Sequence, residues 1–557
     1  MKYQAPKRPL LVPSAVMAAV LTLAPLAAHA DEHEDLEKLR ATVLALIDTL
    51  VKSGLLPRNQ ADAMMKDAQR RATEQLAQAP APEVGADGKK IVRVPYIPEA
   101  VKVQMREQIK AEVLAETRAQ QTVASADSGI GTRFNIMGDF RLRTENLRPN
   151  SSNTAALAYS TNNPDFTRAP DLWANPNANT QAAEKRTRIR LRIDSDFIVN
   201  NQVTVGAGIS TLASTPNSQN QTMATGPGGA PNYFNGYAVG FDKAFLTYKP
   251  FEALAFTGGR FNNPFLATDL VWDESVNFEG AVIKAKGPTP STSNIFMTAG
   301  WFPLAFTSVS SNLYTHRDLY AAQVGADWTY GLKDNHLKVG AAVYDYNNVE
   351  GIMQFTTLPS GTADYLASEY GSGYRQRGNT LFRINTSPLY DSATNWGLAS
   401  SFKELDFTAV ADVAEFDPVH VRLTGDFVYN LGFDRKRIAT RTGAHVIDGS
   451  PYGYLLSLQV GAAKIKEQGD WNAAISYRRL GSDAVIDAFP NGDFGGGGTN
   501  VKGFMLTGNL GIARNTWLTM RLLSSQNIDS AVPNVGQGST ATKFDLDTLQ
   551  LDLNARF

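Results

Sequence analysis

The sequence predicts an all-β fold: an antiparallel transmembrane barrel of about 16 strands, preceded by a short α-helical segment. Three features of the chain indicate this fold. Residues 185–197 alternate charged and apolar side chains, the connections between such runs alternate between short and long, and residues 549–557 end the chain as an amphipathic strand. A membrane barrel with a polar inner face and an apolar outer face accounts for all three.

The alternation at 185–197 separates two sets of side chains. Successive residues of a strand point to opposite faces, whereas a helix would distribute the charges around its surface. One face would carry four guanidiniums, from Arg186, Arg188, Arg190 and Arg192. Neighbouring cations repel one another and need water or counter-anions. The solvated face of a soluble sheet would provide these, and so would a water-filled lumen.

Residues 1–30 have the pattern of a secretory signal peptide. A positive start is followed by an apolar run that ends in the small-x-small site Ala28-His29-Ala30. We expect cleavage after Ala30 and export of the mature chain. A membrane anchor is the less favoured alternative, because the apolar run contains two prolines.

The composition excludes several classes of protein. The 53 basic and 54 acidic residues nearly balance, which gives no support for a nucleic-acid partner. The chain has no cysteine, so something other than disulfides must hold it together, and an extended hydrogen-bonded sheet would suffice. Beyond the signal no apolar run of about 18 residues remains to form a membrane helix. A mean hydropathy of −0.23 is compatible with a barrel, where only alternate strand residues are apolar.

Residues 31–125 are expected to form a helical extension in the periplasm. A heptad spacing joins Leu36, Leu39, Val43, Leu46 and Leu50. A Pro- and Gly-containing linker at 79–91 separates the first helices from a third that begins at Pro98. The repeats are short, so a coiled coil that forms oligomers, a plug for the barrel and simple packing on the barrel stay open.

The barrel is expected over 132–557, where residues alternate with a period of two. Short connections fall at 200–201, 249–252, 331–335, 467–469 and 513–515, with long polar loops between them. Short turns on one side and long loops on the other are typical of bacterial outer-membrane barrels. About 430 residues at about 25–28 per strand and connection give about 16 strands. Residues 350–415 are the least regular part.

The last strand carries a second signal. Its apolar face ends on an aromatic carboxy-terminal residue, Phe557. This resembles the C-terminal signature of outer-membrane proteins of Gram-negative bacteria, which the barrel-assembly machinery recognises. The resemblance implies that machinery and outer-membrane lipid as partners.

Several runs resemble the bacterial putative porin family. They occur in the order Arg93–Glu99, Gly259–Phe265, Thr268–Asp273, Phe278–Gly280, Gly496–Asn500 and Leu549–Phe557. The resemblance implies an outer-membrane diffusion channel with an N-terminal helical extension, and it carries no substrate with it. Small polar solutes or ions are the expected cargo, and a homo-oligomer, with the trimer common among porins, is an open expectation.

A channel needs a constriction with an electric field across it. The candidates for one wall are the arginines of 185–197, together with Arg141 and Arg143 on the preceding strand. By analogy with the inward-folded loop of general porins, the segment 262–277 is the candidate for the other wall. Its acids are Asp269, Asp273 and Glu274. The alternatives are an ordinary extracellular loop at 262–277 and arginines neutralised by lumen acids such as Asp139, Asp194 and Asp196. Excess arginine would give a mild preference for anions.

The main rival of another class is an outer-membrane enzyme. Such an enzyme needs a nucleophile with a base in hydrogen-bond reach. None of the five histidines of the mature chain lies in a recognisable motif: His33, His316, His336, His420 and His445. His420 is interpreted as a wall residue, and the glycines of Gly206-Ala207-Gly208 and Gly495–Gly498 as turn and strand glycines. We therefore expect no catalytic group, metal or cofactor.

A plugged receptor and an envelope tether are two further candidate classes. A plugged receptor would need 22 strands, more than about 430 residues supply at the rate of outer-membrane barrels. An envelope tether built on the helical segment is compatible with channel function.

Overall fold

The computed structural model of the protein describes residues 133–154, 180–213, 215–226, 230–287, 293–306, 316–331, 335–353, 368–371, 373–384, 396–442, 449–529 and 543–557. All of them belong to the second of two units of the chain, Ala115–Phe557. The predicted signal peptide at 1–30 and helical extension at 31–125 with its linker lie outside the described residues.

The described residues form one large antiparallel sheet with the shorter elements attached to it. The strands of the sheet are β1 (Phe134–Pro149), β2 (Glu184–Ile198), β3 (Val203–Thr211), β4 (Gln221–Thr222), β5 (Val239–Phe251), β6 (Leu254–Asn262), β7 (Asn277–Lys286), β8 (Ser293–Phe306), β9 (His316–Tyr330), β10 (Asn335–Asn347), β13 (Lys403–Phe416), β14 (Val419–Asn430), β15 (Tyr452–Gly461), β16 (Trp471–Leu480), β17 (Val501–Ala513), β18 (Thr516–Asn527) and β19 (Asp545–Arg556). The shorter elements are β11 (Leu381–Arg383), β12 (Trp396–Leu398), the helix α5 (Arg435–Thr442) and the 3₁₀ turn η4 (Phe494–Gly496).

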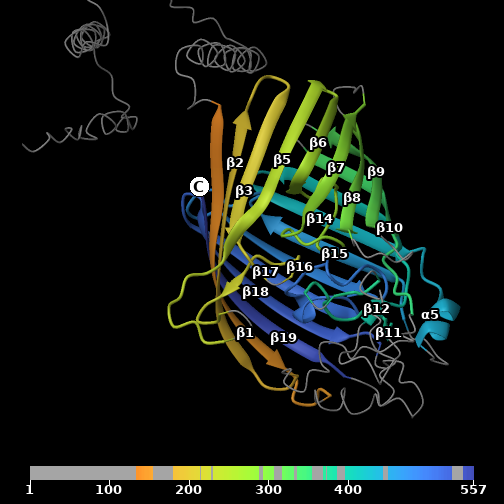
Figure 1. The fold of residues 1–557 in the computed structure, drawn as a ribbon. Coiled ribbons are helices and arrows are strands. Elements are labelled where there is room, and N and C mark those ends of the chain that lie inside the picture. Colours follow the sequence, from red (N-terminus) through yellow and green to blue (C-terminus); the bar gives the residue numbers. More distant parts are fainter. Residues whose placement is uncertain are drawn as a thin grey trace, which may run out of the picture. The chain divides into compact units, whose positions relative to one another are not determined.

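The sheet closes on itself, because β1 pairs with β19 on one side and with β2 on the other (Figure 1). The sheet has 17 strands. The two-residue β4 pairs with the part of β2 that lies beyond the end of β3. The other 16 strands form the closed barrel. The backbones of Gly138 and Phe557 exchange two hydrogen bonds at the seam, of 2.8 and 3.0 Å. A Cβ on Gly138 would lie 2.5 Å from the Phe557 ring, so only glycine lets the terminal ring pack there. Closure of an antiparallel barrel of about 16 strands confirms the fold predicted for this part of the chain.

The barrel wall is apolar outside, and many of its inward side chains are polar, unlike the strands of a soluble protein. On β9 Val324 is 55% exposed while its neighbour Gln323 is 3% exposed, and on β19 Leu551 is 50% exposed while Asp552 is 2% exposed. A contiguous exposed apolar surface of this kind requires lipid around it. Within the described part of the chain, no helix is long and apolar enough to cross a membrane.

The two ends of the barrel differ as the connection lengths predicted. Short turns join β2 to β3, β5 to β6, β9 to β10, β13 to β14 and β17 to β18. Long connections join the same strands at the opposite end. Exposed aromatic side chains stand near strand ends on both sides, with Tyr248 and Trp328 on the short-turn side and Tyr429 on the other. They form the interfacial belts expected of a membrane barrel.

Two long loops fold inward and build a core inside the barrel. These are the β6–β7 loop (263–276) and the β16–β17 loop (481–500). Described residues between β10 and β13, among them Tyr370 and Leu398, join the same core. Apolar side chains of both loops, among them Leu270 and Ile486, are buried in one cluster with Phe302 and Leu319 of the wall. Backbone hydrogen bonds connect the two loops, from Asp273 to Phe489 (2.8 Å) and from Asn491 to Asp269 (2.9 Å). The two loops therefore form a single partition across the lumen, which we call the inner partition.

Candidate functional site

The predicted arginine wall is formed by β1 and β2, whose register places basic residues opposite each other. Arg141 stands across from Arg190 and Arg143 across from Arg188. The cross-strand pairs on either side of these two are mixed, because Asp139 faces Arg192 and Glu145 faces Arg186. Four adjacent arginines thus lie between two pairs that each contain one acid. We call the six arginines of these two strands the arginine ladder.

Glu145 is the shared carboxylate partner of the arginines nearest the long loops. Its carboxylate accepts hydrogen bonds from Arg186 Nε at 2.7 Å and from Arg188 Nη1 at 3.3 Å. It is 1% exposed and lies 3.7 Å from Arg143. Three guanidiniums around one buried carboxylate offset its loss of hydration.

Asp139 performs the same role nearer the short turns. It accepts from Arg192 Nε at 2.7 Å and from Arg190 Nη2 at 3.0 Å. Arg190 also donates to Glu274 of the inner partition at 2.6 Å. Desolvation opposes ionisation of Glu274, but the guanidiniums of Arg190 and Arg192 outweigh it and lower the pKa of this carboxyl. Glu274 is therefore the predicted acid that does meet the ladder.

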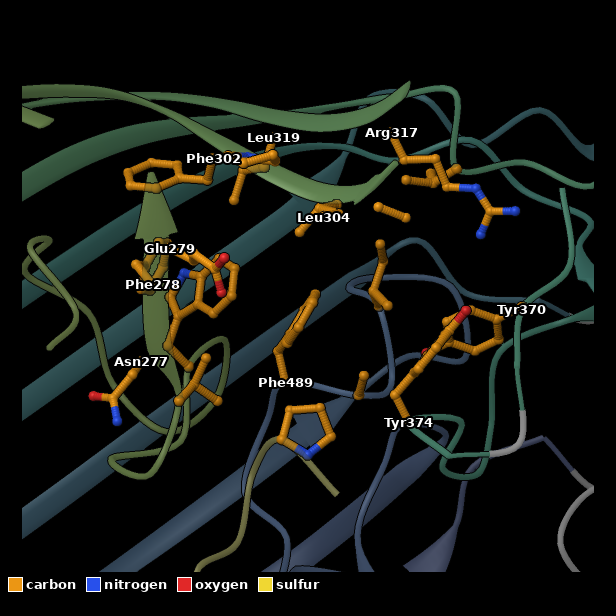
Figure 2. A pocket seen from close by; sticks show the side chains of 18 of the residues that line it. Asn277, Phe278, Glu279, Phe302, Leu304, Arg317, Leu319, Tyr370, Tyr374 and Phe489 are labelled. Atoms are coloured by element: carbon orange, nitrogen blue, oxygen red, sulfur yellow. The ribbon is translucent and has the colours of Figure 1, made fainter. Parts of the chain in front are cut away.

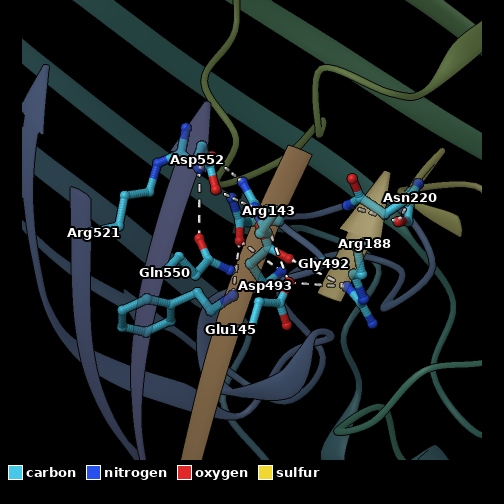
Figure 3. A network of polar contacts seen from close by, with 12 residues as sticks. Arg143, Glu145, Arg188, Asn220, Gly492, Asp493, Arg521, Gln550 and Asp552 are labelled. Atoms are coloured by element: carbon cyan, nitrogen blue, oxygen red, sulfur yellow. Dashed lines mark hydrogen bonds and ion pairs between the residues drawn. The ribbon is translucent and has the colours of Figure 1, made fainter. Parts of the chain in front are cut away.

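Arg143 is the most deeply buried arginine of the ladder, at 0% exposure. It forms a two-pronged contact with Asp552 of β19, at 2.8 and 2.9 Å. Its second hydrogen-bond partner is Asp493 of the inner partition, to which it donates from Nη1 (Figure 3). Arg143 thus connects the barrel seam to the β16–β17 loop through charge-assisted hydrogen bonds, which are stronger than neutral ones.

Asp493 owes its place to the glycines that follow it. Gly495, Gly496, Gly497 and Gly498 all have φ between 64° and 90°, a region that favours glycine. A Cβ on Gly498 would lie 2.1 Å from the Arg377 carbonyl oxygen. Burial opposes ionisation of Asp493, but the nearby arginines, Arg143 first, lower its pKa. Gly495–Gly498, interpreted together with Gly206–Gly208 as turn and strand glycines, lie in the turn η4 and the bends after it, and Gly206–Gly208 lie on β3.

Asp269 and Asp273 have partners other than the ladder, contrary to the simple two-wall picture. Asp269 receives two hydrogen bonds of 2.9 Å from Arg478 on β16 and one of 2.6 Å from Asn491. Asp273 accepts from the backbone of Ser275 at 2.8 Å. Burial, reinforced by surrounding carboxylates, raises the pKa of Asp273 to about 7. The β6–β7 loop faces β16 as well as β2, so one segment divides its acids between two walls.

Arg141 differs from the other members of the ladder. It is 7% exposed and donates to Asn220 Oδ1 at 2.6 Å. Among the described residues no carboxylate lies within 4.0 Å of it, and its Nε has no hydrogen-bond partner. The positive charge of Arg141 is therefore the least compensated of the six.

Two adjoining cavities follow the ladder along the lumen. The larger, of about 920 Å³, is bordered by Glu145, Arg186 and Arg188. The smaller, of about 310 Å³, is bordered by Arg141 and by the three predicted acids of the β6–β7 loop. The two cavities share the residues Asn217, Asn220, Asp493 and Gln550. We call this shared boundary, with Arg141 beside it, the constriction.

Several members of the site were not predicted from the sequence. Glu145 and Asp552 alternate onto the polar faces of their strands, so their position inside the barrel was predictable, although their partners were not. Asp493 gave no signal, because a single aspartate in a glycine-rich loop is common. Of the acids proposed as neutralisers, Asp139 binds the ladder, whereas Asp194 pairs with Lys243 at 2.7 Å.

The histidine predicted to belong to the wall does so. His420 lies on β14 with its Nδ1 2.8 Å from Asp412 on β13. In the part of the chain that the structure describes, no group of three or more His, Cys, Asp or Glu side chains is arranged to hold a metal ion.

A closed membrane barrel with a polar lumen narrowed by inward loops defines the class of outer-membrane channels. A family model described as "Putative porin" matches residues 40–557. The chain therefore belongs to the putative porin family and to the outer membrane.

Comparison with solved structures finds distant likenesses to other outer-membrane proteins. The outer membrane channel DcaP of Acinetobacter baumannii is 13% identical, with a TM-score of 0.37 over 76% of this chain and 97% of that one. OprB of Pseudomonas putida at high pH is 10% identical, with a TM-score of 0.40 over 76% and 94%. OmpF of Salmonella typhi, in complex with daunomycin, is 10% identical, with a TM-score of 0.37 over 76% and 97%. No curated protein matches the sequence.

Proposed function

We propose that this barrel is a passive diffusion channel for small hydrophilic solutes and ions, with a mild preference for anions. The observation that carries the proposal is the constriction, where polar and charged groups border adjoining cavities inside an otherwise closed barrel. The short turns would face the periplasm, as in bacterial barrels, with the helical extension on that side. The same proposal includes recognition of Phe557, which is 59% exposed, by the barrel-assembly machinery. It also includes a trimeric state.

The preference should be mild because ion pairs compensate most of the ladder. Five of its six arginines have a carboxylate within 4.0 Å. The uncompensated charge is concentrated at Arg141, which borders the smaller cavity. A solute passing the constriction thus meets one strong cation among balanced pairs.

Replacing Arg141 tests this assignment directly. We expect Arg141→Glu to invert the preference and Arg141→Gln to bring the chloride-to-potassium permeability ratio close to one. Unit charges 4 Å apart interact by about 1–4 kcal/mol at effective dielectric constants of about 80 to 20, so the charge reversal should change the ratio at least about threefold. Reversal potentials of the refolded full chain in planar bilayers under a KCl gradient measure this.

A matched control for Arg141 is Arg514→Gln, at a short turn where the side chain is 84% exposed. It should leave the reversal potential unchanged. A wild-type channel that prefers potassium would contradict the assignment, as would an Arg141→Glu channel with wild-type selectivity.

The anion preference should also fall as the pH rises through about 7. Asp273 has a pKa raised to about 7, so it is mostly neutral below this pH and negative above it. Its negative charge adds to Glu274 and Asp493 beside the same cavity and offsets Arg141. Reversal potentials at pH 6 and pH 8 measure the change, and Asp273→Asn should abolish it. The same pH dependence in Asp273→Asn would show that another group titrates.

A further inference from the structure

The inner partition has a second face, turned away from the arginine ladder. On the β6–β7 loop, residues 273–275 border the polar cavity, whereas Trp272 and Val276 border a different one. On the β16–β17 loop, Asn491 and Asp493 border the polar cavity, whereas Ile486, Ala488 and Phe489 border the other. The partition is therefore amphipathic, with acids on one face and apolar side chains on the other.

The apolar face encloses a cavity of about 270 Å³ against the wall formed by β7, β8 and β9 (Figure 2). This volume exceeds that of an apolar cavity of about 150 Å³ which suffices for benzene. We call it the side cavity. It shares no lining residue with either polar cavity.

Aromatic rings form the main walls of the side cavity. The Trp272 ring lies 4.6 Å from that of Phe278 and 5.0 Å from that of Phe489, between ring centroids. Phe278 in turn meets Phe302 edge to face at 4.9 Å. Such walls offer ring faces and edges, which favour a further aromatic ring over a flexible polar chain.

Three charged side chains line the side cavity, two of them exposed and one buried. Arg260 and Glu279 lie 3.6 Å apart as an exposed pair that is neutral overall. Arg317 is 7% exposed and donates to the Glu369 carbonyl at 2.6 Å. In Figure 2 Arg317 stands with Tyr370 and Tyr374 at one end of the cavity, opposite Phe278 and Phe302. One end of the side cavity is thus lined by phenylalanine rings, and the other by the Arg317 guanidinium and two tyrosines.

We propose that the side cavity binds small aromatic carboxylates, with the ring packed against the cavity-facing sides of Trp272, Phe302 and Phe489 and the carboxylate toward Arg317. A guanidinium favours an anionic group over a neutral or cationic one of the same shape. This inference goes beyond diffusion of hydrophilic solutes, because it assigns a saturable site for an amphipathic molecule to the apolar half of the lumen.

The test uses 4-fluorobenzoate as a ¹⁹F NMR probe with the refolded full chain in a non-ionic detergent. We expect saturable line broadening that Leu304→Trp weakens at least about tenfold, since its larger ring would occupy the cavity. Arg317→Gln should remove a preference of about tenfold for 4-fluorobenzoate over 4-fluorobenzyl alcohol. Partition of the probe into detergent is not saturable and does not depend on the variant, so these differences isolate the site.

Matched controls are Leu456→Trp, on the exposed outer face of β15, and Arg514→Gln, at an exposed turn. Both should bind as the wild type does. Should Leu304→Trp lose its heat-modifiable gel migration, Ala488→Phe fills the cavity from the partition instead. Any of three results would overturn the proposal. The wild type shows no saturable binding, the cavity-filled variant binds as well as the wild type, or the wild type binds the acid and the alcohol with equal affinity. Loss of the site would leave ion conductance unchanged, so the two proposals fail separately.

Discussion

Replacement of Arg143 by methionine is expected to destabilise the barrel by about 3–5 kcal/mol, the cost of removing one partner from a buried ion pair. Arg143 is fully buried and is the shared partner of Asp552 and Asp493. Its loss leaves two carboxylates without their main cation and detaches the β16–β17 loop from the barrel seam. We therefore also expect a larger and noisier single-channel conductance.

The measurements for Arg143→Met are urea unfolding of the refolded protein and single-channel recording. Arg514→Met removes an arginine that is 84% exposed and should change neither result. Wild-type stability together with wild-type conductance would show that Arg143 does not hold the loop. The double variant Arg143→Met with Asp493→Leu should recover part of the stability, since it removes one of the stranded charges.

Replacement of Trp272 by alanine is expected to have a comparable effect on the other half of the partition. The Trp272 ring contacts Phe278 and Tyr344 of the wall and Phe489 of the second loop. It therefore connects both inward loops to the barrel. Truncation of a buried tryptophan costs about 3–5 kcal/mol, and the loosened partition should raise open-channel current noise.

Trp471→Ala is the matched control for Trp272→Ala, because Trp471 lies on the outer face and is 48% exposed. Its loss affects the lipid interface and should leave the open-channel current unchanged. Quiet, wild-type currents from Trp272→Ala would contradict a partition held by this ring.

The barrel was predictable because its signal is local. In each strand the alternation of polar and apolar side chains indicates which face meets lipid. On β19, for example, the polar residues Gln550, Asp552 and Asn554 identify the inward face. The register at the seam, which sets Arg143 opposite Asp552, follows only once the barrel is known to close. It joins residues about 400 positions apart, a distance over which periodicity carries no information.

The inner partition was only half predictable. The polar segment 262–277 stood out because it separates two clear strands, whereas its buried Leu270 and Trp272 gave no sign of facing an internal core. The inward course of the β16–β17 loop was not predicted, because glycines at positive φ specify a backbone path that composition does not reveal. The irregular stretch around β11 and β12 contributes a separate two-stranded sheet, for which no alternation could be read.

The most direct test of a conducting path past Arg141 is thiol blockade at a single introduced cysteine. The native chain contains none, so Asn220→Cys places one thiol where the two polar cavities meet. After modification by an anionic or a cationic methanethiosulfonate, we expect single-channel conductance to fall by about half or more, because added bulk narrows the constriction. Leu456→Cys, on the outer face, should show no change. Unchanged conductance of fully modified Asn220→Cys would contradict a pore at this site.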